Sequence, residues 1–237
     1  MEYKVLSLTH KQTQMTVHPV IIFNDLELIL CDTGYPNQLL QIEEELNKNN
    51  FSIKDITKIV ITHHDHDHIG SLKSIKDKNN DLKIISSEIE AEYIIGAKPS
   101  LRLMQIQEKI KTLTGKEKEF GLMFSNYLKT IENYPVDKFV KNGEYITDDL
   151  KVIFTHGHSP GHISLLLENH NLLIAGDALI IENDKFINQE ELVFDTKNFL
   201  ESIKIIKEIN NVDKIICYHG GVVDTDINNK LNELIKK

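Results

Sequence analysis

Residues 61–70 read Ile-Thr-His-His-Asp-His-Asp-His-Ile-Gly, and four histidines and two aspartates fill the six positions from His63 to His68. Imidazole and carboxylate groups bind divalent transition metals at neutral pH. Crowding them into one segment has no packing advantage, because each is costly to bury without a partner. A solvated polar loop is the alternative interpretation. The apolar run Ile59–Ile61 favours the metal site, because a buried strand would hold these side chains at its carboxyl end.

Three other apolar runs end in a residue of the same kind. His158 lies in residues 154–162, which follow a predicted strand and contain two glycines and a proline. Asp177 comes directly after one strand-like run, and His219 lies near the end of another; each is next to a glycine. Each residue alone would more often be a hydrogen-bonded polar group than a ligand. Together with residues 63–68, they predict one metal site assembled from the ends of several strands.

Composition restricts the class of protein. Lysine and arginine total 27 of the 237 residues against 36 acidic residues, so the formal net charge is −9 and nonspecific nucleic-acid binding is disfavoured. No apolar run approaches the ~18 residues of a membrane span, and the N-terminus lacks a basic segment followed by an apolar one. Cys31 and Cys217 lie in apolar runs and are expected to be buried free thiols. We therefore expect a cytoplasmic protein without nucleic-acid or membrane partners; the sequence defines no oligomeric state.

Hydrophobic periodicity predicts alternating strands and helices. We expect strands at Tyr3–Leu8, Val20–Phe23, Leu26–Cys31, Lys58–Ile61, Leu82–Ile85, Glu144–Ile146, Lys151–Phe154, Ile163–Leu167, Leu172–Ala175 and Lys214–Cys217, and helices at Gln38–Asn47, Ile69–Lys78, Thr196–Ile209 and Ile227–Ile235. Both halves of the chain repeat this outline, which predicts two packed sheets with outer helices in one domain, 1–237. Residues 87–134 are long, charged and helical, and form either ordinary helices on a core or a cap over a site.

The order of these motifs resembles the metallo-β-lactamase superfamily. The motifs are Asp32-Thr33-Gly34, then Thr62-His63 with Asp67-His68, then His158 to His162, then Gly176-Asp177, then His219. The resemblance implies an α/β fold, a four-layer αββα sandwich with a helical insert at about 87–134 and two metal ions at one edge of the sheets. It implies that His63, Asp65 and His158 hold the first metal, that Asp67, His68 and His219 hold the second, and that Asp177 bridges them.

One position departs from the family motif, which reads His-x-His-x-Asp-His. The frame set by Asp67 and His68 places Asp65 where the second histidine belongs, and leaves His64 and His66 as spacers. The alternative is that His64 or His66 completes the first site. A carboxylate favours manganese or iron relative to an all-imidazole set without excluding zinc, and its charge should make a bound water less acidic. We expect two divalent ions, with zinc as the first choice and iron or manganese as alternatives.

The expected activity is a metal-dependent hydrolase that directs a metal-bound hydroxide at a small carbonyl substrate, namely a thioester, lactone or ester. Asp67 is the candidate catalytic residue, because a metal-held carboxylate stays ionised and can move a proton. Asp32, Thr62 and His162 are expected to hydrogen-bond the ligand imidazoles. The hydrolase branch is similar to glyoxalase II and the homoserine-lactone hydrolases. The alternatives are an iron-dependent oxidoreductase such as a persulfide dioxygenase, a small phosphodiesterase, and a binding module without activity.

Overall fold

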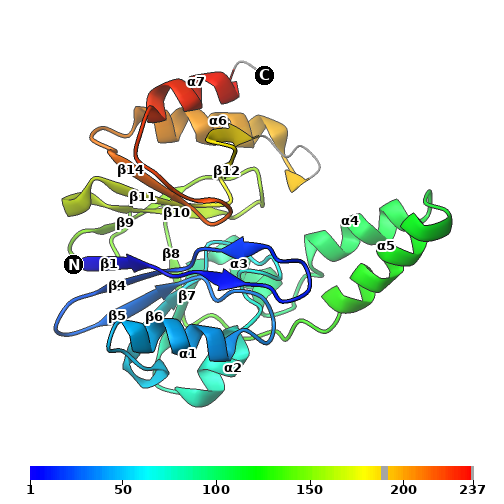
Figure 1. Cartoon of the computed structure of the whole chain (residues 1–237), viewed down its shortest axis with the longest axis horizontal. Helices are drawn as coiled ribbons and strands as arrows, with labels where there is room; N and C mark the ends of the chain where they lie inside the picture. The colour runs from blue at the N-terminus through cyan, green and yellow to red at the C-terminus, as the bar shows by residue number, and fades with distance from the viewer. Residues whose placement is uncertain (188–191, 236–237) are drawn as a thin grey trace.

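Two sheets pack face to face with helices on both outer sides, as Figure 1 shows. The computed structural model describes residues 1–187 and 192–235. The layers follow the order helix, sheet, sheet, helix, and the chain runs through the first pair of layers before it builds the second. The expected αββα sandwich is therefore confirmed.

The first sheet has six strands in the order β1-β4-β5-β6-β7-β8, and α1 and α2 cover its outer face (Figure 1). Strands β5 to β8 are parallel, so the loops that follow β5, β6 and β7 leave the same edge of the sheet. Its elements are β1 (Glu2–Val5), β4 (Val20–Phe23), β5 (Leu28–Cys31), α1 (Leu39–Lys48), η1 (Ile53–Asp55), β6 (Ile56–Val60), α2 (Leu72–Lys78), β7 (Lys83–Ser87) and β8 (Lys138–Val140).

The second sheet has five strands in the order β15-β14-β11-β10-β9, and α6 and α7 cover its outer face. The parallel pair β11 and β14 sends both of its carboxyl ends to one edge. Its elements are β9 (Leu150–Phe154), β10 (Ile163–Leu167), η2 (Glu168–His170), β11 (Leu172–Gly176), α6 (Thr196–Glu208), β14 (Lys214–Cys217), β15 (Gly221–Val223) and α7 (Ile227–Ile235). Two short hairpins lie outside both sheets: β2 (Leu8–Thr9) pairs with β3 (Thr16–Val17), and β12 (Ile180–Glu182) pairs with β13 (Lys185–Ile187).

Three apolar layers hold the sandwich together. The central one joins the two sheets and contains Ile29 and Val60 from the first and Leu165 from the second. The outer layers pack Leu46 of α1 beneath the first sheet and Ile203 of α6 above the second. Each fully buried side chain of this size contributes about 1.5–3 kcal/mol. A rigid frame of this kind fixes the loops at its edge.

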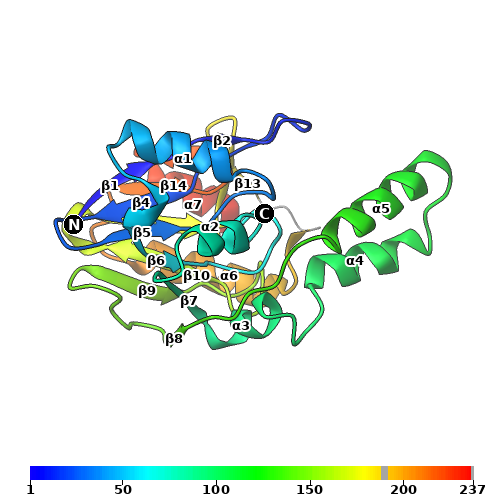
Figure 2. The same cartoon turned by 90° about the horizontal axis from the view of Figure 1, so that it is seen from below.

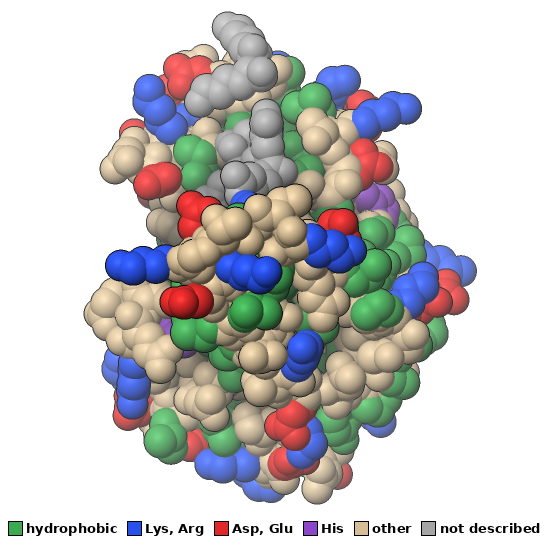
Figure 3. All heavy atoms as spheres, turned by 90° about the vertical axis from the view of Figure 1, so that its right-hand side faces the viewer, with side chains coloured by type: hydrophobic (Ala, Val, Ile, Leu, Met, Phe, Trp, Pro, Cys, Tyr) green, Lys and Arg blue, Asp and Glu red, His purple; other side chains and the backbone are tan. Residues whose placement is uncertain are grey.

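Residues 88–128 form three helices, α3 (Glu88–Ile94), α4 (Leu101–Ile110) and α5 (Gly115–Leu128). Helices α4 and α5 pair into a hairpin that projects from the body of the sandwich, as both views show (Figures 1 and 2). The face that carries this hairpin exposes hydrophobic side chains among lysines (Figure 3), and Phe120 and Met123 are 63% and 62% exposed. The hairpin therefore packs on the core only near its base.

Some sequence-based expectations were wrong in detail. The expected strand at Glu144–Ile146 is absent from the described part of the chain, where Tyr145 forms only an isolated bridge to Lys151. Strands β8, β12, β13 and β15 were not expected, because three residues are too few to show a period of two. Cys31 and Cys217 are buried free thiols, as predicted. None of the described helices is long and apolar enough to cross a membrane.

Candidate metal centre

Loops from both sheets bring the predicted ligands to one place. Residues 61–68 follow β6 of the first sheet, and His158 follows β9 of the second. Asp177 comes directly after β11, and His219 lies two residues after β14. The predicted ligands therefore come from four strand ends, and their convergence depends on the packing of the two sheets.

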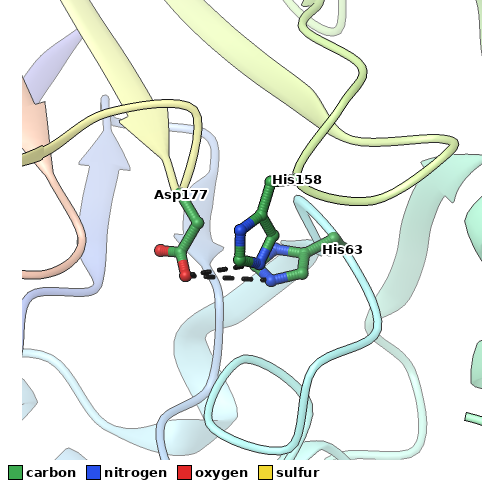
Figure 4. Close-up of side chains that lie close together, drawn as sticks. All are labelled: His63, His158 and Asp177. Carbon is green, nitrogen blue, oxygen red and sulfur yellow. Dashed lines mark ion pairs between the residues drawn. The ribbon is translucent and has the colours of Figure 1, made fainter. Parts of the chain in front are cut away.

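The first group of candidate ligands is His63, His158 and Asp177. Their side chains point toward one another from different loops (Figure 4), and their ligand atoms lie within 4.8 Å of one another. The Asp177 Oδ2 atom is 4.0 Å from His63 Nε2 and 3.6 Å from His158 Nε2. All three residues are buried.

The second group is Asp67, His68 and His219, whose ligand atoms also lie within 4.8 Å of one another. His219 Nε2 is 3.1 Å from Asp67 Oδ2 and 3.4 Å from Asp177 Oδ2. His68 Nε2 is 3.4 Å from Asp177 Oδ1. Asp177 thus faces imidazole nitrogens of both groups, which is the position that a bridging carboxylate needs.

Several of these atoms have no hydrogen-bond partner among the described residues. They are buried and comprise His63 Nε2, His68 Nε2 and Asp177 Oδ1. A buried polar atom without a partner costs about 1–3 kcal/mol, so a cluster of them needs an occupant. Neutral imidazole and carboxylate donors suit zinc, iron and manganese. The residues present therefore fit a pair of divalent ions.

The carboxylates around His68 and His219 favour protons on these two imidazoles when no cation is bound. Burial lowers the pKa of His219, but Asp177 and Asp67 outweigh burial and raise this pKa to about 10. Burial also opposes protonation of His68, yet Asp177 and Asp32 raise its pKa well above the usual value. Without metal, the His219 imidazole is therefore protonated at neutral pH, and the neighbouring carboxylates favour the protonated form of His68 as well. Binding of a cation must release these protons.

Asp65 lies beside the first group and is paired with an arginine. Its Oδ2 atom is 3.4 Å from His158 Nε2 and 3.7 Å from His63 Nε2, and it accepts hydrogen bonds of 2.8 and 3.3 Å from Arg102 Nη2 and Nε. Burial raises the pKa of Asp65, but Arg102 and the two histidines hold it well below its usual range. The proposed role of Asp65 as a ligand stays a prediction. Sequence reasoning missed Arg102, although it is the single arginine among 27 basic residues.

The three residues expected around the ligands contact them in different ways. Asp32 Oδ2 accepts a hydrogen bond of 2.9 Å from His68 Nδ1, which leaves His68 Nε2 facing Asp177. Thr62 Oγ1 donates to Asp32 Oδ2 over 2.8 Å and lies 3.1 Å from His63 Nδ1. His162 was expected to hydrogen-bond a ligand imidazole, but among the described residues it forms no such bond. Its Nε2 instead accepts a hydrogen bond from the backbone N–H of Asp177 over 3.0 Å. It therefore holds the bridging residue by its backbone.

Glu90 of α3 connects the two loops that carry His63 and His158. Its Oε2 atom accepts from the backbone N–H of His64 over 3.0 Å and from His64 Nδ1 over 2.5 Å. Its Oε1 atom accepts from Ser159 Oγ over 2.6 Å and from Gly161 N over 2.8 Å. The carboxylate is fully buried, and no short motif in the sequence indicated it.

Tyr218 fastens the same region from the second sheet. Its hydroxyl donates to the backbone oxygen of Asp67 over 2.6 Å and accepts from Gly34 N over 3.1 Å. Its ring packs on His68, with the ring centres 3.9 Å apart. The backbone of the Asp67-His68 pair is thus fixed by a residue 151 positions further along the chain.

His64 and His66 belong to neither candidate ligand group, although His66 Nδ1 lies 3.6 Å from Asp67 Oδ1. The His64 ring stacks on Tyr93 at 4.3 Å, and His66 contacts the ring of Tyr127 at 5.7 Å. Both histidines line a cavity of about 240 Å³ at the base of the α4–α5 hairpin. The cavity is also lined by Ile69, Tyr93, Gly96, Lys98, Pro99, Ser100, Leu103, Leu128, Lys129, Ile131 and Asn133.

Comparison with known proteins places the chain in a family. The metallo-beta-lactamase superfamily profile matches residues 14–219. The chain belongs to this superfamily, as its motifs predicted. It is 28% identical over 171 residues to the probable metallo-hydrolase YflN of Bacillus subtilis, covering 69% of this chain and 62% of YflN. It is 26% identical over 207 residues to the N-acyl homoserine lactonase AiiA of Bacillus thuringiensis subsp. kurstaki, covering 84% and 78% of the two chains.

The chain thus aligns with less than two thirds of the length of YflN. Solved structures agree on the fold. The metallo-beta-lactamase family protein TTHA1429 from Thermus thermophilus has a TM-score of 0.75 at 20% identity, and the match covers 99% of this chain and 78% of that protein. The archaeal superfamily protein ST1585 from Sulfolobus tokodaii has a TM-score of 0.67 at 18% identity, with coverage of 99% and 84%.

Proposed function

We propose that the protein is a dinuclear metal-dependent hydrolase that acts on a small carbonyl substrate, a thioester, lactone or ester. The observation that carries this proposal is the position of Asp177. Its carboxylate lies within 4.0 Å of an Nε2 atom from four different histidines, two in each candidate ligand group. One anion between two sets of donors supports a pair of cations, for which zinc is the first choice. Two such cations lower the pKa of a water and polarise a carbonyl oxygen.

Asp67 is the residue that we propose moves a proton. Its Oδ2 atom faces His219, and its Oδ1 atom is 3.6 Å from His66 Nδ1, on the side of the cavity. Burial raises the pKa of Asp67, but His66 and His219 outweigh burial and keep the carboxyl ionised. An ionised carboxylate at this place can orient the attacking water, accept its proton and pass that proton to the leaving group.

The cavity beside His66 supports a small amphipathic substrate. Apolar side chains such as Leu103 and Leu128 line it together with Lys98 and Lys129. A volume of about 240 Å³ accommodates a small organic group, whereas the net charge of −9 opposes a polyanion such as a nucleic acid. The relatives named N-acyl homoserine lactonase support a carbonyl substrate for this chain.

The alternative is iron-dependent oxidation. The carboxylate of Asp65 favoured iron or manganese, because its oxygen is a harder donor than an imidazole nitrogen and because it adds negative charge next to the first metal. The ion pair between Asp65 and Arg102 cancels that charge. The reason to prefer iron over zinc is thereby weakened, and hydrolysis is the function that the contacts support best.

Metal analysis and a substrate screen test the proposal. Protein purified without added metal is analysed for zinc, iron and manganese, and is then assayed on thioesters, lactones, esters and phosphodiesters. We expect about two divalent ions per chain and hydrolysis of a carbonyl substrate. His68→Ala and His158→Ala should each remove the activity, whereas His170→Ala, which alters a histidine on η2 that contacts Met1, should retain it. Mostly iron, together with oxygen consumption on a persulfide, would overturn hydrolysis.

A further inference from the structure

Arg102 is the one group of the α4–α5 hairpin that contacts a proposed metal ligand through an ion pair among the described residues. It lies in the first turn of α4 and is 6% exposed. Both Nη2 and Nε donate to the same Asp65 oxygen, the one that also faces His63 and His158. The guanidinium therefore stands directly behind the first group of ligands.

The rest of the Arg102 side chain is held by further contacts. Its Nη1 donates to Gln105 Oε1 over 2.7 Å, and its Nη2 donates to the backbone oxygen of Leu192 over 3.2 Å. The ring of Phe194 packs 5.0 Å from the guanidinium carbon. With four of its five N–H donors used in these contacts, the side chain is held in place. Its positive charge acts on Asp65.

Charge is the property in which position 65 departs from the superfamily motif. A histidine there would be a neutral donor, whereas Asp65 brings a negative charge next to the first metal. A buried charge is poorly screened by salt, so one unit at this distance changes the affinity for a divalent cation strongly. We propose that Arg102 is a charge-compensating residue, which neutralises Asp65 and gives the first metal position the formal charge of an all-histidine site. The inference rests on the proposed metal centre.

A charge-compensating role and a purely structural role of Arg102 predict opposite changes in metal affinity when the residue is removed. If Arg102 only held Asp65 in place, its removal would loosen a ligand and weaken metal binding. If Arg102 compensates charge, its removal leaves a full negative charge beside the first position and strengthens the binding of a divalent cation. A histidine at position 65 should in turn be tolerated only when the positive charge of Arg102 is also removed.

The test is a double-mutant cycle of metal affinity. Metal-free wild type, Arg102→Gln, Asp65→His and the double variant are titrated with Co²⁺ against a competing chelator, and the visible absorption of bound Co²⁺ is recorded. The same titrations in a His219→Ala background, which keeps His63, His158 and Asp177, attribute the change to the first position. Lys116→Gln is the matched control, because it removes one positive charge from the exposed surface of the same hairpin.

Loss of an outer contact of a metal ligand typically costs about 10- to 100-fold in metal affinity, and we take this as the size, not the sign, of the change. We expect Arg102→Gln to bind Co²⁺ at least about tenfold more tightly and Asp65→His about tenfold more weakly than wild type, with the double variant near wild type. Arg102→Lys, which keeps the charge, should stay near wild type. If Arg102→Gln fails to fold, the test rests on the Co²⁺ affinity that the double variant regains relative to Asp65→His.

Weaker binding by Arg102→Gln, or no recovery in the double variant, would overturn charge compensation. If wild type binds Co²⁺ and Arg102→Gln binds it with the same affinity, charge compensation is overturned and the hydrolase proposal stays intact. A wild-type protein that binds no Co²⁺ overturns the proposed metal centre itself. The two failures are therefore distinguishable.

Discussion

The carboxylate of Glu90 should contribute measurably to the stability of the metal-free protein. Its two oxygens accept four hydrogen bonds, two from His64 and two from Ser159 and Gly161. Leu101 N lies 3.4 Å from His64 Nε2 and donates to it, so the proton of a neutral His64 is on Nδ1, which donates to Glu90. The substitution that tests this network with the least change in shape is Glu90→Gln.

A glutamine offers an oxygen to one pair of donors and an NH₂ group to the other. If the NH₂ faces Ser159, that hydroxyl can turn and accept, but the N–H of Gly161 loses its acceptor. If the NH₂ faces His64, the imidazole can change tautomer, but the backbone N–H of His64 loses its acceptor and Nε2–H then opposes Leu101 N–H. At least one buried N–H is orphaned in either orientation, and each costs about 1–3 kcal/mol.

We therefore expect Glu90→Gln to lower the free energy of unfolding by about 2 kcal/mol, or the Tm by about 4–8 °C for a chain of this size. Urea unfolding of the metal-free protein, followed by circular dichroism, measures the change. Glu88→Gln, an exposed position on the same helix, is the control and should change stability by less than about 0.5 kcal/mol. A Glu90→Gln variant as stable as that control would refute the role given to Glu90.

Two further predictions concern the second ligand group. Asp32→Asn keeps an acceptor for His68 but removes the charge, so Co²⁺ titration should show metal affinity lowered by about 10- to 100-fold; an unchanged affinity would contradict the role of Asp32. The raised pKa of His219, about 10 against an ordinary 6.5, means that folding favours its protonated form. The Tm of metal-free protein should therefore fall as the pH rises from about 6.5 to about 10, whereas a Tm that rises over this window would disprove the shift.

Much of the fold could be predicted because the main strands are continuous apolar runs. The ranges Val20–Phe23, Ile163–Leu167 and Lys214–Cys217 match the observed strands residue for residue. Such strands are buried on both faces of their sheet, so they appear in the sequence as continuous apolar runs that are easy to recognise. Strand β8 escaped prediction for the opposite reason, since Phe139 at its centre is 52% exposed and the strand has three residues.

The candidate ligands could be proposed because each follows a strand, and the resemblance to the metallo-β-lactamase superfamily then assigned them to one edge of the sheets. Their partners could not be found in this way. Arg102 meets Asp65 across 37 positions, and Glu90 meets Gly161 across 71. Contacts of this kind depend on how α3 and α4 settle against the loops, which no local pattern encodes.

These distant contacts also suggest that the insert shapes the chemistry as well as the pocket. The first turn of α4 reaches the metal loop twice, through Leu101 N to His64 and through Arg102 to Asp65. Residues just before and within the same helix, including Ser100 and Leu103, line the cavity. A change in the angle or sequence of this turn would therefore alter the substrate pocket and the charge at the first metal position together. Replacing the hairpin with another one should therefore change substrate range and metal preference together, because the same turn of α4 contacts the cavity and Asp65.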